Sequence, residues 1–551
     1  MKMKERNTQL QNTLGKIDTK EVVKEVQSIP KEDTVNRQGH AAYSLSDELR
    51  LVTMLNTTKI EPQFYRSENE TIKELRDLIE RIAVNDPYFV AQAIVYSRCM
   101  GEGMRSINHL AAALLSPFIA GQEYAKRFYS TFNKREKKGG CIFRADDPNE
   151  IKDAFTAISG NAVLANAMKK GFKTAIENFD TYQLCKYRKQ VIDVTNLVHA
   201  NPANSKAEVT INGEKLKVLD AIMKGITISA DTWEVAQSEA GQVVAKAVKE
   251  GKITKEQADE VLAEAKADNW ENLLKDGKLG MMAALRNIRN IMKNPRKDII
   301  DMWCELIQDG EKARAALILP IYFDLAYDVV DEEFGQYDCA NQVRDALQKG
   351  YLNSIPNLAR IFTGKTLVVV DRSGSMDSDV AVNGKRGRSS WSATRPTSAC
   401  CYKAGLIAAS ICKASQADVV KFGSTAEFFP YNKNVNVFTL ARQIGTASCD
   451  STNPAAAFDL IRRQKKAYDR IVFISDNEVN GRLTSSAYKD YIHDVCSPYI
   501  YGIDLAAYGT APLKGDKVNY FFGYGPSLYE AIQAKEFNAS DIIDEIRKIE
   551  I

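Results

Sequence analysis

Histidine is scarce in this chain. Its 551 residues include only four histidines, and they stand far apart, at His40, His109, His199 and His493. There are ten cysteines, but none of them form a C-x-x-C pair. A structural zinc site needs closely spaced Cys and His ligands, so we do not expect one. A ribonuclease that works through paired histidines is disfavoured for the same reason.

Long apolar runs are also missing. No stretch reaches the roughly 18 unbroken apolar residues that a membrane helix needs. Residues 1–24 are too polar and charged for a secretory signal. Most cysteines stand alone among apolar residues, which is typical of free thiols in a reducing cytosol. We therefore expect a cytoplasmic protein that makes no contact with a membrane.

The net charge is low as well. It is +3 for the whole chain, so the protein is not a polycation of the histone kind. Any surface for nucleic acid must therefore come from local clusters of Lys and Arg.

The length and the apolar pattern predict a multidomain protein of α plus α/β class. A chain of this length is expected to form two to four domains of roughly 100–200 residues each. Residues 1–35 are polar and are predicted to form an N-terminal arm. In residues 36–360 apolar side chains recur at helical spacing, as at Ile72, Leu75 and Ile79. Many short helices joined by short polar turns predict an α-solenoid for this part.

Residues 361–551 have a different pattern. Short continuous apolar runs predict strands that are buried on both faces, and helical patterns lie between them. Alternating strands and helices predict right-handed βαβ units and an open parallel, doubly wound sheet. The expected strands are 366–370, 417–422, 471–475, 498–503 and 519–522.

The first of these strands leads into a segment of oxygen-bearing side chains. The spacing of Asp371, Ser373 and Ser375 offers one carboxylate and two hydroxyls from a single turn. That turn lies at the carboxyl end of a strand, where doubly wound sheets bind ligands. Thr452 and Asp476 fall in later loops that can converge with it. Oxygen ligands suit Mg²⁺ or Mn²⁺ and do not suit zinc. The alternative is that Asp371 and Ser373 only cap a helix and shape a turn.

These five residues resemble the metal-ion-dependent adhesion site (MIDAS) of von Willebrand factor A domains at all of its usual positions. The resemblance implies one divalent metal, with Mg²⁺ as the first choice and Mn²⁺ as the alternative. It also implies a coordination position left open for a carboxylate from a partner.

A second informative stretch is basic. Lys169 and Lys173 are four residues apart and share a helix face, and Lys170 is three residues before Lys173. Tyr187 stands among further basic residues, where it is predicted to stack on a base. The alternative is an ordinary solvated helix face.

Several short segments of the sequence resemble the Ro autoantigen family, whose members carry a TROVE module. The segments occur in the same order as in that family and cover roughly residues 36–551. They are Ser44–Arg50, Met168–Phe172, Tyr182–Tyr187, Leu197–Pro202, Trp270–Leu274 and Leu285–Asn287.

This resemblance implies a ring-like solenoid of HEAT-type repeats over 36–360, followed by a von Willebrand factor A-like domain over 361–551. In that family small structured Y RNAs bind an outer basic surface, and single-stranded ends of misfolded RNAs enter a central hole. Bacterial members can be tethered through such an RNA to a 3′-to-5′ exoribonuclease. A ring closed within one chain favours a monomer. The residues that the resemblance places on the RNA surface are Lys169, Lys170, Lys173, Lys186, Arg188 and His199, and the basic cluster at Arg286 is added to them.

The leading hypothesis is therefore a non-catalytic RNA-binding scaffold for noncoding RNA, acting in RNA quality control or degradation. The alternative is a metal-dependent protein-interaction module on a helical solenoid, for which RNA binding is incidental. A metal-dependent nuclease is disfavoured because two-metal chemistry needs clustered carboxylates. Residues 203–268 and 378–397 look longer than in the family, and the second stretch carries the basic segment Lys385–Arg388.

Overall fold

The computed structural model describes the chain from residue 25 onward, apart from short gaps. The described residues are 25–160, 163–211, 213–226, 228, 241, 243–250, 252, 254–377, 399–446, 451–538 and 540–551. The basic segment 385–388 lies outside them.

The chain divides into two compact units that are interleaved in sequence. The α/β unit contains Met1–Leu78 and Ile355–Asp544, and the helical unit contains Ile79–Ser354 and Glu545–Ile551. The break at residue 355 lies near the predicted boundary at 361. The first 78 residues and the C-terminal seven are grouped differently from the predicted division.

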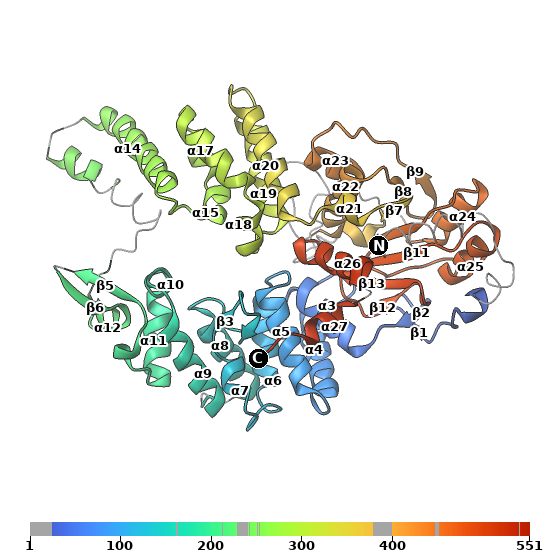
Figure 1. Ribbon diagram of the computed structural model, residues 1–551, viewed down its shortest axis with the longest axis horizontal. Coiled ribbons are helices and arrows are strands. Elements are labelled where there is room, and N and C mark those ends of the chain that lie inside the picture. Colours follow the sequence, from blue (N-terminus) through green and yellow to red (C-terminus); the bar gives the residue numbers. More distant parts are fainter. Residues whose placement is uncertain are drawn as a thin grey trace. The chain divides into compact units, whose positions relative to one another are not determined.

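A six-stranded sheet forms the centre of the α/β unit (Figure 1), with the strand order β13-β11-β10-β7-β8-β9. All neighbouring pairs are parallel except β8 with β9. The five predicted strands are confirmed, but the antiparallel edge strand was not expected. The turn between β8 and β9 is too short for a parallel crossover, so the chain must return antiparallel. The strands are β7 (Thr366–Asp371), β8 (Asp418–Phe422), β9 (Ala426–Phe428), β10 (Arg470–Ser475), β11 (Tyr499–Asp504) and β13 (Val518–Phe522).

Helices cover both faces of this sheet. Every residue of β7 is buried, as expected for a central strand with both faces covered. Leu367 and Val369 point to one face and pack in a core with Phe458 and Tyr488 from α24 and α25. Helix α22 contacts β7 and packs with α23. The helices of this part are α22 (Cys400–Ala414), α23 (Val437–Ile444), α24 (Ala455–Arg463), α25 (Thr484–Asp494) and α26 (Pro526–Asn538).

The N-terminal residues of the α/β unit are folded from residue 25 onward. Strands β1 (Thr34–Val35) and β2 (Ala41–Ser44) pair, and β2 also pairs with β12 (Thr510–Ala511). Ile29 is only 6% exposed and belongs to the core of the sheet. Residues 25–35 of the predicted N-terminal arm are therefore packed within the α/β unit. A few scattered apolar residues and a two-residue strand are too weak a signal to read from the sequence.

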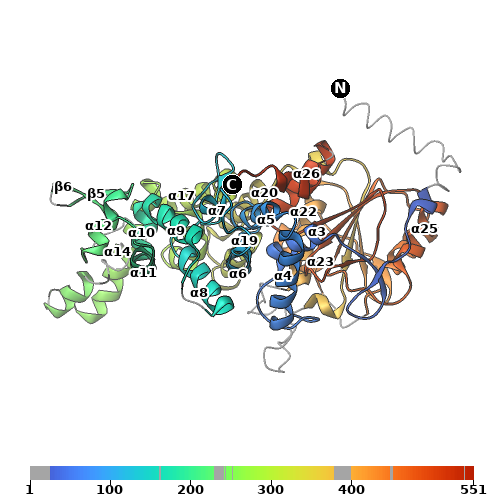
Figure 2. The same cartoon turned by 90° about the horizontal axis from the view of Figure 1, so that it is seen from below.

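The helical unit is a succession of mostly short helices that pack against neighbours close in sequence (Figures 1 and 2). Helix α4 (Glu68–Ala83) crosses from one unit into the other. The next helices are α5 (Pro87–Cys99), α6 (Ser106–Leu115), α7 (Ala125–Phe128), α8 (Asp147–Ser159), α9 (Asn166–Asn178), α10 (Thr181–Lys186), α11 (Arg188–Val198) and α12 (Val218–Met223). They are followed by α14 (Lys255–Lys275), α15 (Met281–Arg286), α16 (Ile288–Met292), α17 (Lys297–Gln308), α18 (Gly310–Ala315), α19 (Pro320–Glu333) and α20 (Ala340–Ser354).

The helix-rich character predicted for this part is confirmed, and its described residues also contain two short hairpins. Strands β5 (Glu208–Ile211) and β6 (Glu214–Lys217) pair antiparallel. A second hairpin, β3 (Phe132–Asn133) with β4 (Lys138–Gly139), was not expected. Part of the predicted insertion at 203–268 is thus a hairpin followed by helices.

Candidate functional site

The predicted metal ligands lie at the carboxyl ends of two neighbouring strands. β7 ends at Asp371 and pairs in parallel with β10, which ends at Ser475 just before Asp476. The connections from β7 and β10 run to opposite sides of the sheet, so this is its topological switch point. Ligands bind to doubly wound sheets at such a point.

Asp371 is held by hydrogen bonds on both carboxylate oxygens. Its Oδ1 accepts from the Ser373 amide at 2.8 Å, and its Oδ2 accepts from the Ser475 hydroxyl at 2.6 Å. The hydroxyls of Ser373 and Ser375 are 3.2 Å apart. All of these side chains are buried. The sharp turn after β7 therefore gathers one carboxylate and two hydroxyls at one point.

Asp476 places a second buried carboxylate beside this turn. One oxygen accepts from the Glu478 amide at 3.2 Å, and the Ser375 hydroxyl lies near the carboxylate. The other oxygen, Oδ2, is buried and accepts no well-directed hydrogen bond from any described residue. Burial and the neighbouring Asp371 carboxylate raise the pKa of Asp476 well above its usual value. Burial raises the pKa of Asp371 to about 6.

This set of side chains fits a hard divalent cation. A cation between the two carboxylates would supply the partner that Asp476 Oδ2 lacks and would offset the cost of burying two like charges. In the part of the chain that the structure describes, no three His, Cys, Asp or Glu side chains form a metal-binding group. The predicted site depends instead on two carboxylates with serine and threonine hydroxyls, the oxygen chemistry that Mg²⁺ prefers.

Thr452 is buried but less directly connected to the other four residues. Its amide donates to Asn480 Oδ1 at 3.0 Å, and its carbonyl accepts from the Asn480 amide at 2.7 Å. Asn480 lies in the loop that follows Asp476. Thr452 is thus tied to the same loop cluster through its backbone, while the Ser375 hydroxyl lies beside the Asp476 carboxylate.

The structure adds residues that the sequence did not indicate. Glu478 is fully buried, and burial raises its pKa to about 7. Tyr65 faces Ser375 and Asp476 from a segment more than 300 residues away in the sequence. Glu478 stands two residues after a predicted ligand and offered a weak local signal, whereas Tyr65 offered none.

The predicted RNA-binding lysines lie together on helix α9. Met168, Phe172 and the other apolar residues of α9 are buried, and the lysines occupy the opposite side. Lys170 is exposed, and Lys169 and Lys173 are partly exposed. Among the described residues, none of these three ammonium groups forms an ion pair. They therefore place three positively charged groups, without an ion pair among the described residues, on one helix.

The basic residues after α9 are partly committed to contacts within the protein. Lys186 donates to the Tyr182 hydroxyl at 2.6 Å and lies 5.0 Å from the centre of its ring. Arg188 donates to the carbonyls of Ile226 at 2.8 Å and Ile222 at 3.4 Å, at the end of α12. Arg188 is therefore also a structural contact between helices.

Tyr187, predicted to stack on a base, already has a cation over its ring. The Arg144 guanidinium lies 4.8 Å from the ring centre, and it also donates to the Tyr187 hydroxyl. His199 is exposed and ends α11 in a left-handed conformation, with φ of 50°. Arg286 is exposed at the end of α15.

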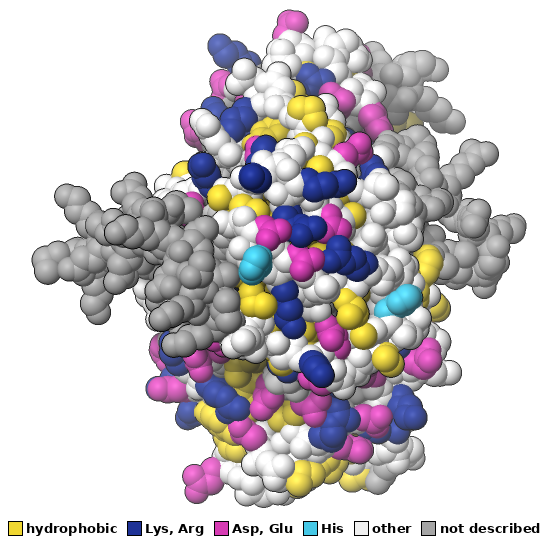
Figure 3. Space-filling model, turned by 90° about the vertical axis from the view of Figure 1, so that its right-hand side faces the viewer, with side chains coloured by type: hydrophobic (Ala, Val, Ile, Leu, Met, Phe, Trp, Pro, Cys, Tyr) yellow, Lys and Arg dark blue, Asp and Glu magenta, His cyan; other side chains and the backbone are white. Residues whose placement is uncertain are grey.

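The other basic clusters differ from α9 in having partners. Lys134 donates to the carbonyls of Arg314 at 3.3 Å and Ala315 at 2.9 Å. Arg289 forms an ion pair with Glu333. On the face of the molecule that Figure 3 shows, Lys and Arg side chains alternate with Asp and Glu. Local neutralisation of this kind is what the low net charge predicts.

One of the solved structures that match this chain covers most of it. It is the Ro (RSR) protein of Deinococcus radiodurans, matched at a TM-score of 0.47 and 14% sequence identity over 89% of this chain and 100% of that chain. The short sequence segments named above resemble the same family. No family model and no curated protein sequence matches the chain.

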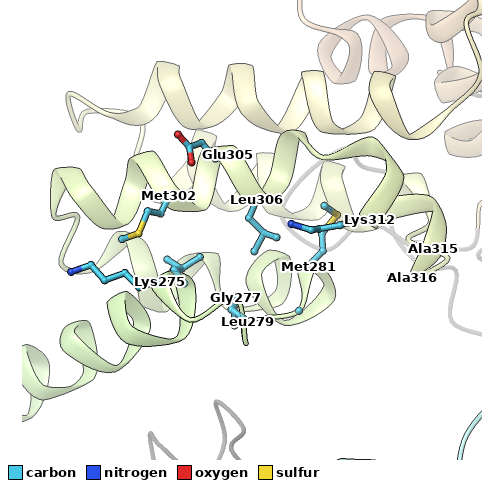
Figure 4. A pocket seen from close by; sticks show the side chains of 12 residues that line it. Lys275, Gly277, Leu279, Met281, Met302, Glu305, Leu306, Lys312, Ala315 and Ala316 are labelled. Carbon is cyan, nitrogen blue, oxygen red and sulfur yellow. The ribbon is translucent and has the colours of Figure 1, made fainter.

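A separate cavity lies within the helical unit, between α14, α15, α17 and α18. It has a volume of about 830 Å³. Met281, Met302 and Leu306 give it an apolar lining, with Lys275 and Lys312 at opposite ends (Figure 4). None of the predicted metal or RNA residues line it. None of the helices described is both long and apolar enough to span a membrane.

Proposed function

We propose that this protein is a Ro-like RNA-binding scaffold that holds RNA without cleaving it. The observation that carries the proposal is the group of three lysines on α9, which is exposed on a rigid helix and lacks acidic partners among the described residues. Lysines in this setting bind phosphates, and phosphate contacts fix an RNA without reading its sequence.

The RNA class follows from the resemblance stated for the sequence. It is a small structured noncoding RNA of the Y RNA type, together with the single-stranded ends of misfolded RNAs. The protein would act in the cytoplasm as a monomer, in a ribonucleoprotein that serves RNA quality control or degradation. A 3′-to-5′ exoribonuclease tethered through the RNA would supply the catalysis that the scaffold itself lacks.

The test is RNA binding by filter retention across a salt series. The probe is a structured RNA with a single-stranded 3′ tail. Wild type is compared with Lys170→Ala/Lys173→Ala and with a matched control, Lys246→Ala/Lys249→Ala. The control removes two exposed lysines at the same spacing from another helix. Each lost phosphate contact makes the slope of log K against log salt shallower by about 0.9.

We expect the α9 variant to bind more weakly than both wild type and control. Its slope of log K against log salt should be shallower by the amount that two lost phosphate contacts give. The probe should remain intact throughout. Equal affinity of the α9 variant and the control would contradict the role of α9. Cleavage of the probe that is lost in Asp371→Ala would contradict the non-catalytic assignment.

A second function is supported by the convergence of Asp371, Ser373, Ser375 and Asp476. These residues would hold one Mg²⁺, which would bind a carboxylate of a protein partner. Isothermal titration with Mg²⁺ or Mn²⁺ should show one site in wild type and none in Asp371→Ala. Asp371→Ala should still bind RNA as wild type does. If wild type binds metal but binds RNA no better than a neutral protein, the metal-dependent interaction module becomes the function of the chain.

A further inference from the structure

The candidate metal site is covered by another part of the same unit. The cover consists of residues 36–38 and Tyr65, and all of it belongs to the α/β unit. Tyr65 is half-buried, and its hydroxyl faces Ser375 and the Asp476 carboxylate. Tyr65 is thus a partly exposed side chain in contact with two of the buried candidate ligands.

The cover is fastened to the loop that carries Asp476. The Asn36 amide nitrogen Nδ2 donates to the Val479 carbonyl at 2.6 Å, and the Arg37 backbone amide donates to Glu478 Oε2 at 2.9 Å. Gln38 Nε2 donates to the Glu478 carbonyl at 3.0 Å. The loop after β10 is therefore held by side-chain and backbone bonds from the N-terminal segment.

Gln38 connects the two parts of the cover to the rest of the site. Its Nε2 also donates to the Tyr65 hydroxyl at 2.9 Å, and its Oε1 accepts from Asn480 Nδ2 at 2.9 Å. Asn480 in turn bonds the backbone of Thr452. One chain of hydrogen bonds thus runs from Tyr65 through Gln38 and Asn480 to a predicted metal ligand.

Aromatic contacts also hold the Tyr65 ring in place. Its ring packs edge-to-face on Tyr508, with ring centres 5.5 Å apart, and the Arg37 and Arg66 guanidinium groups each lie 5.5 Å from the centre of the Tyr508 ring. A tyrosine hydroxyl is a neutral phenol near neutral pH, able to donate to a carboxylate or to offer an oxygen to a cation.

We infer that the metal site is self-closed: the Tyr65 hydroxyl occupies the position that a carboxylate from a partner would take, and Gln38 holds it there. The inference rests on the proposed metal site. Its consequence is that an acidic partner must displace Tyr65 before it can reach the cation. Binding of that partner is then regulated by how firmly residues 36–38 hold the loop after Asp476.

The experiment uses the full-length protein and Tb³⁺, a hard oxygen-seeking cation whose emission is sensitised by a nearby tyrosine. Binding is measured by calorimetry in parallel, so that loss of emission is separated from loss of binding. Tyr65→Phe removes only the hydroxyl and keeps the ring packing. Tyr322→Phe, a partly exposed tyrosine of the helical unit, is the matched control.

We expect Tyr65→Phe to bind Tb³⁺ but to lose most of the sensitised emission, while Tyr322→Phe matches wild type. With Mn²⁺ bound, acetate should bind Tyr65→Phe about fivefold more tightly than wild type, the factor that one ordinary hydrogen bond gives. Gln38→Ala should shift acetate binding in the same direction, since it frees the Tyr65 hydroxyl.

Two results would overturn the inference, and they are distinguishable. If Tyr65→Phe matches Tyr322→Phe in both emission and acetate affinity, the site exists but Tyr65 does not close it. If Asp371→Ala binds the cation as wild type does, or wild type binds none, the metal site itself is wrong and the closure fails with it.

Discussion

At the scale of single residues, the strongest constraint in the helical unit is one buried carboxylate. Asp147 is fully buried at the start of α8, and its oxygens accept from Arg98 at 2.7 and 2.8 Å. His109 Nε2 lies 2.9 Å from the same carboxylate, and the amides of Phe143 and Arg144 donate to it at 2.9 and 2.8 Å. The carboxylate thus joins α5, α6 and α8.

Asp147→Asn is expected to destabilise the protein strongly. The substitution keeps the size of the side chain but leaves the Arg98 guanidinium buried without a counter-charge. Breaking a buried ion pair from one side costs about 3–5 kcal/mol. The measurement is urea unfolding followed by circular dichroism. Asp153→Asn, on the exposed side of the same helix, is the control and should change stability by less than about 0.5 kcal/mol.

The same carboxylate predicts a pH dependence. Burial alone would raise the pKa of Asp147, but the Arg98 charge and the His109 contact outweigh it and hold the pKa well below the usual value. A lowered pKa stabilises the fold above the unfolded value of about 4, and that stability is lost as the pH falls further. Wild type should therefore lose stability below pH of about 4 more steeply than Asp147→Asn does. Parallel curves for the two proteins would show that Asp147 is not the group responsible.

At the scale of helices, close packing depends on a glycine in α20. A Cβ on Gly350 would lie 2.2 Å from the Ile307 carbonyl oxygen of α17 and 2.9 Å from the Phe323 ring of α19. Gly350 therefore lets three helices approach one another. No feature of the sequence indicated that this position needs glycine.

Gly350→Ala should lower stability although alanine is the better helix former. The gain in propensity is about 1 kcal/mol, and overpacking a tight contact costs typically about 1–3 kcal/mol or more. We expect a net loss measurable as a lower midpoint of urea unfolding. Gly280→Ala is the matched control, because a Cβ there meets nothing within 4 Å and the backbone φ is −70°. An unchanged or raised midpoint in Gly350→Ala would mean that α17 and α20 shift apart at little cost.

The elements differ in how well the sequence predicts them, for physical reasons. Continuous apolar runs mark the central strands, because both of their faces are buried, and β7 and β10 were found in place. The edge strand β9 and the two-residue β12 carry no such run. β9 is only three residues long, and β12 pairs with β2, which is far away in the sequence. The spacing of Ile72, Leu75 and Ile79 is helical, and these residues do lie on one helix, α4.

The residues of the candidate site also differ in how well the sequence predicts them. The turn from Asp371 to Ser375 is local, so its spacing could be read directly. Asp476 was found because it follows a recognisable strand. Tyr65 and Gln38 reach the site only through tertiary folding, and no local pattern links them to Asp371. Arg188 shows the converse, since its basic character was visible but its bonds to Ile222 and Ile226 were not.

At the scale of the whole molecule, the sequence order does not follow the compact units. The central part of the chain forms the helical unit, and the α/β unit is built from segments on both sides of it. Ile29 lies in the sheet core, Tyr43 is 1% exposed, and Arg66 bonds the carbonyls of Ala506 and Ala507. The N-terminal segment is thus a structural part of the α/β unit.

The piece 355–544 is therefore expected to be incomplete on its own. Without residues 25–78 it would expose the core around Ile29 and leave β12 unpaired. A separate peptide of residues 25–78 should bind it and raise its midpoint of thermal unfolding. The gain follows the peptide concentration, reaching about 2.7 kcal/mol at a hundredfold excess over Kd. A scrambled peptide of the same composition should give no shift. If 355–544 unfolds at the same temperature with and without the true peptide, residues 25–78 only rest on a unit that is already complete. In that case Tyr65 could close the metal site only in the intact chain.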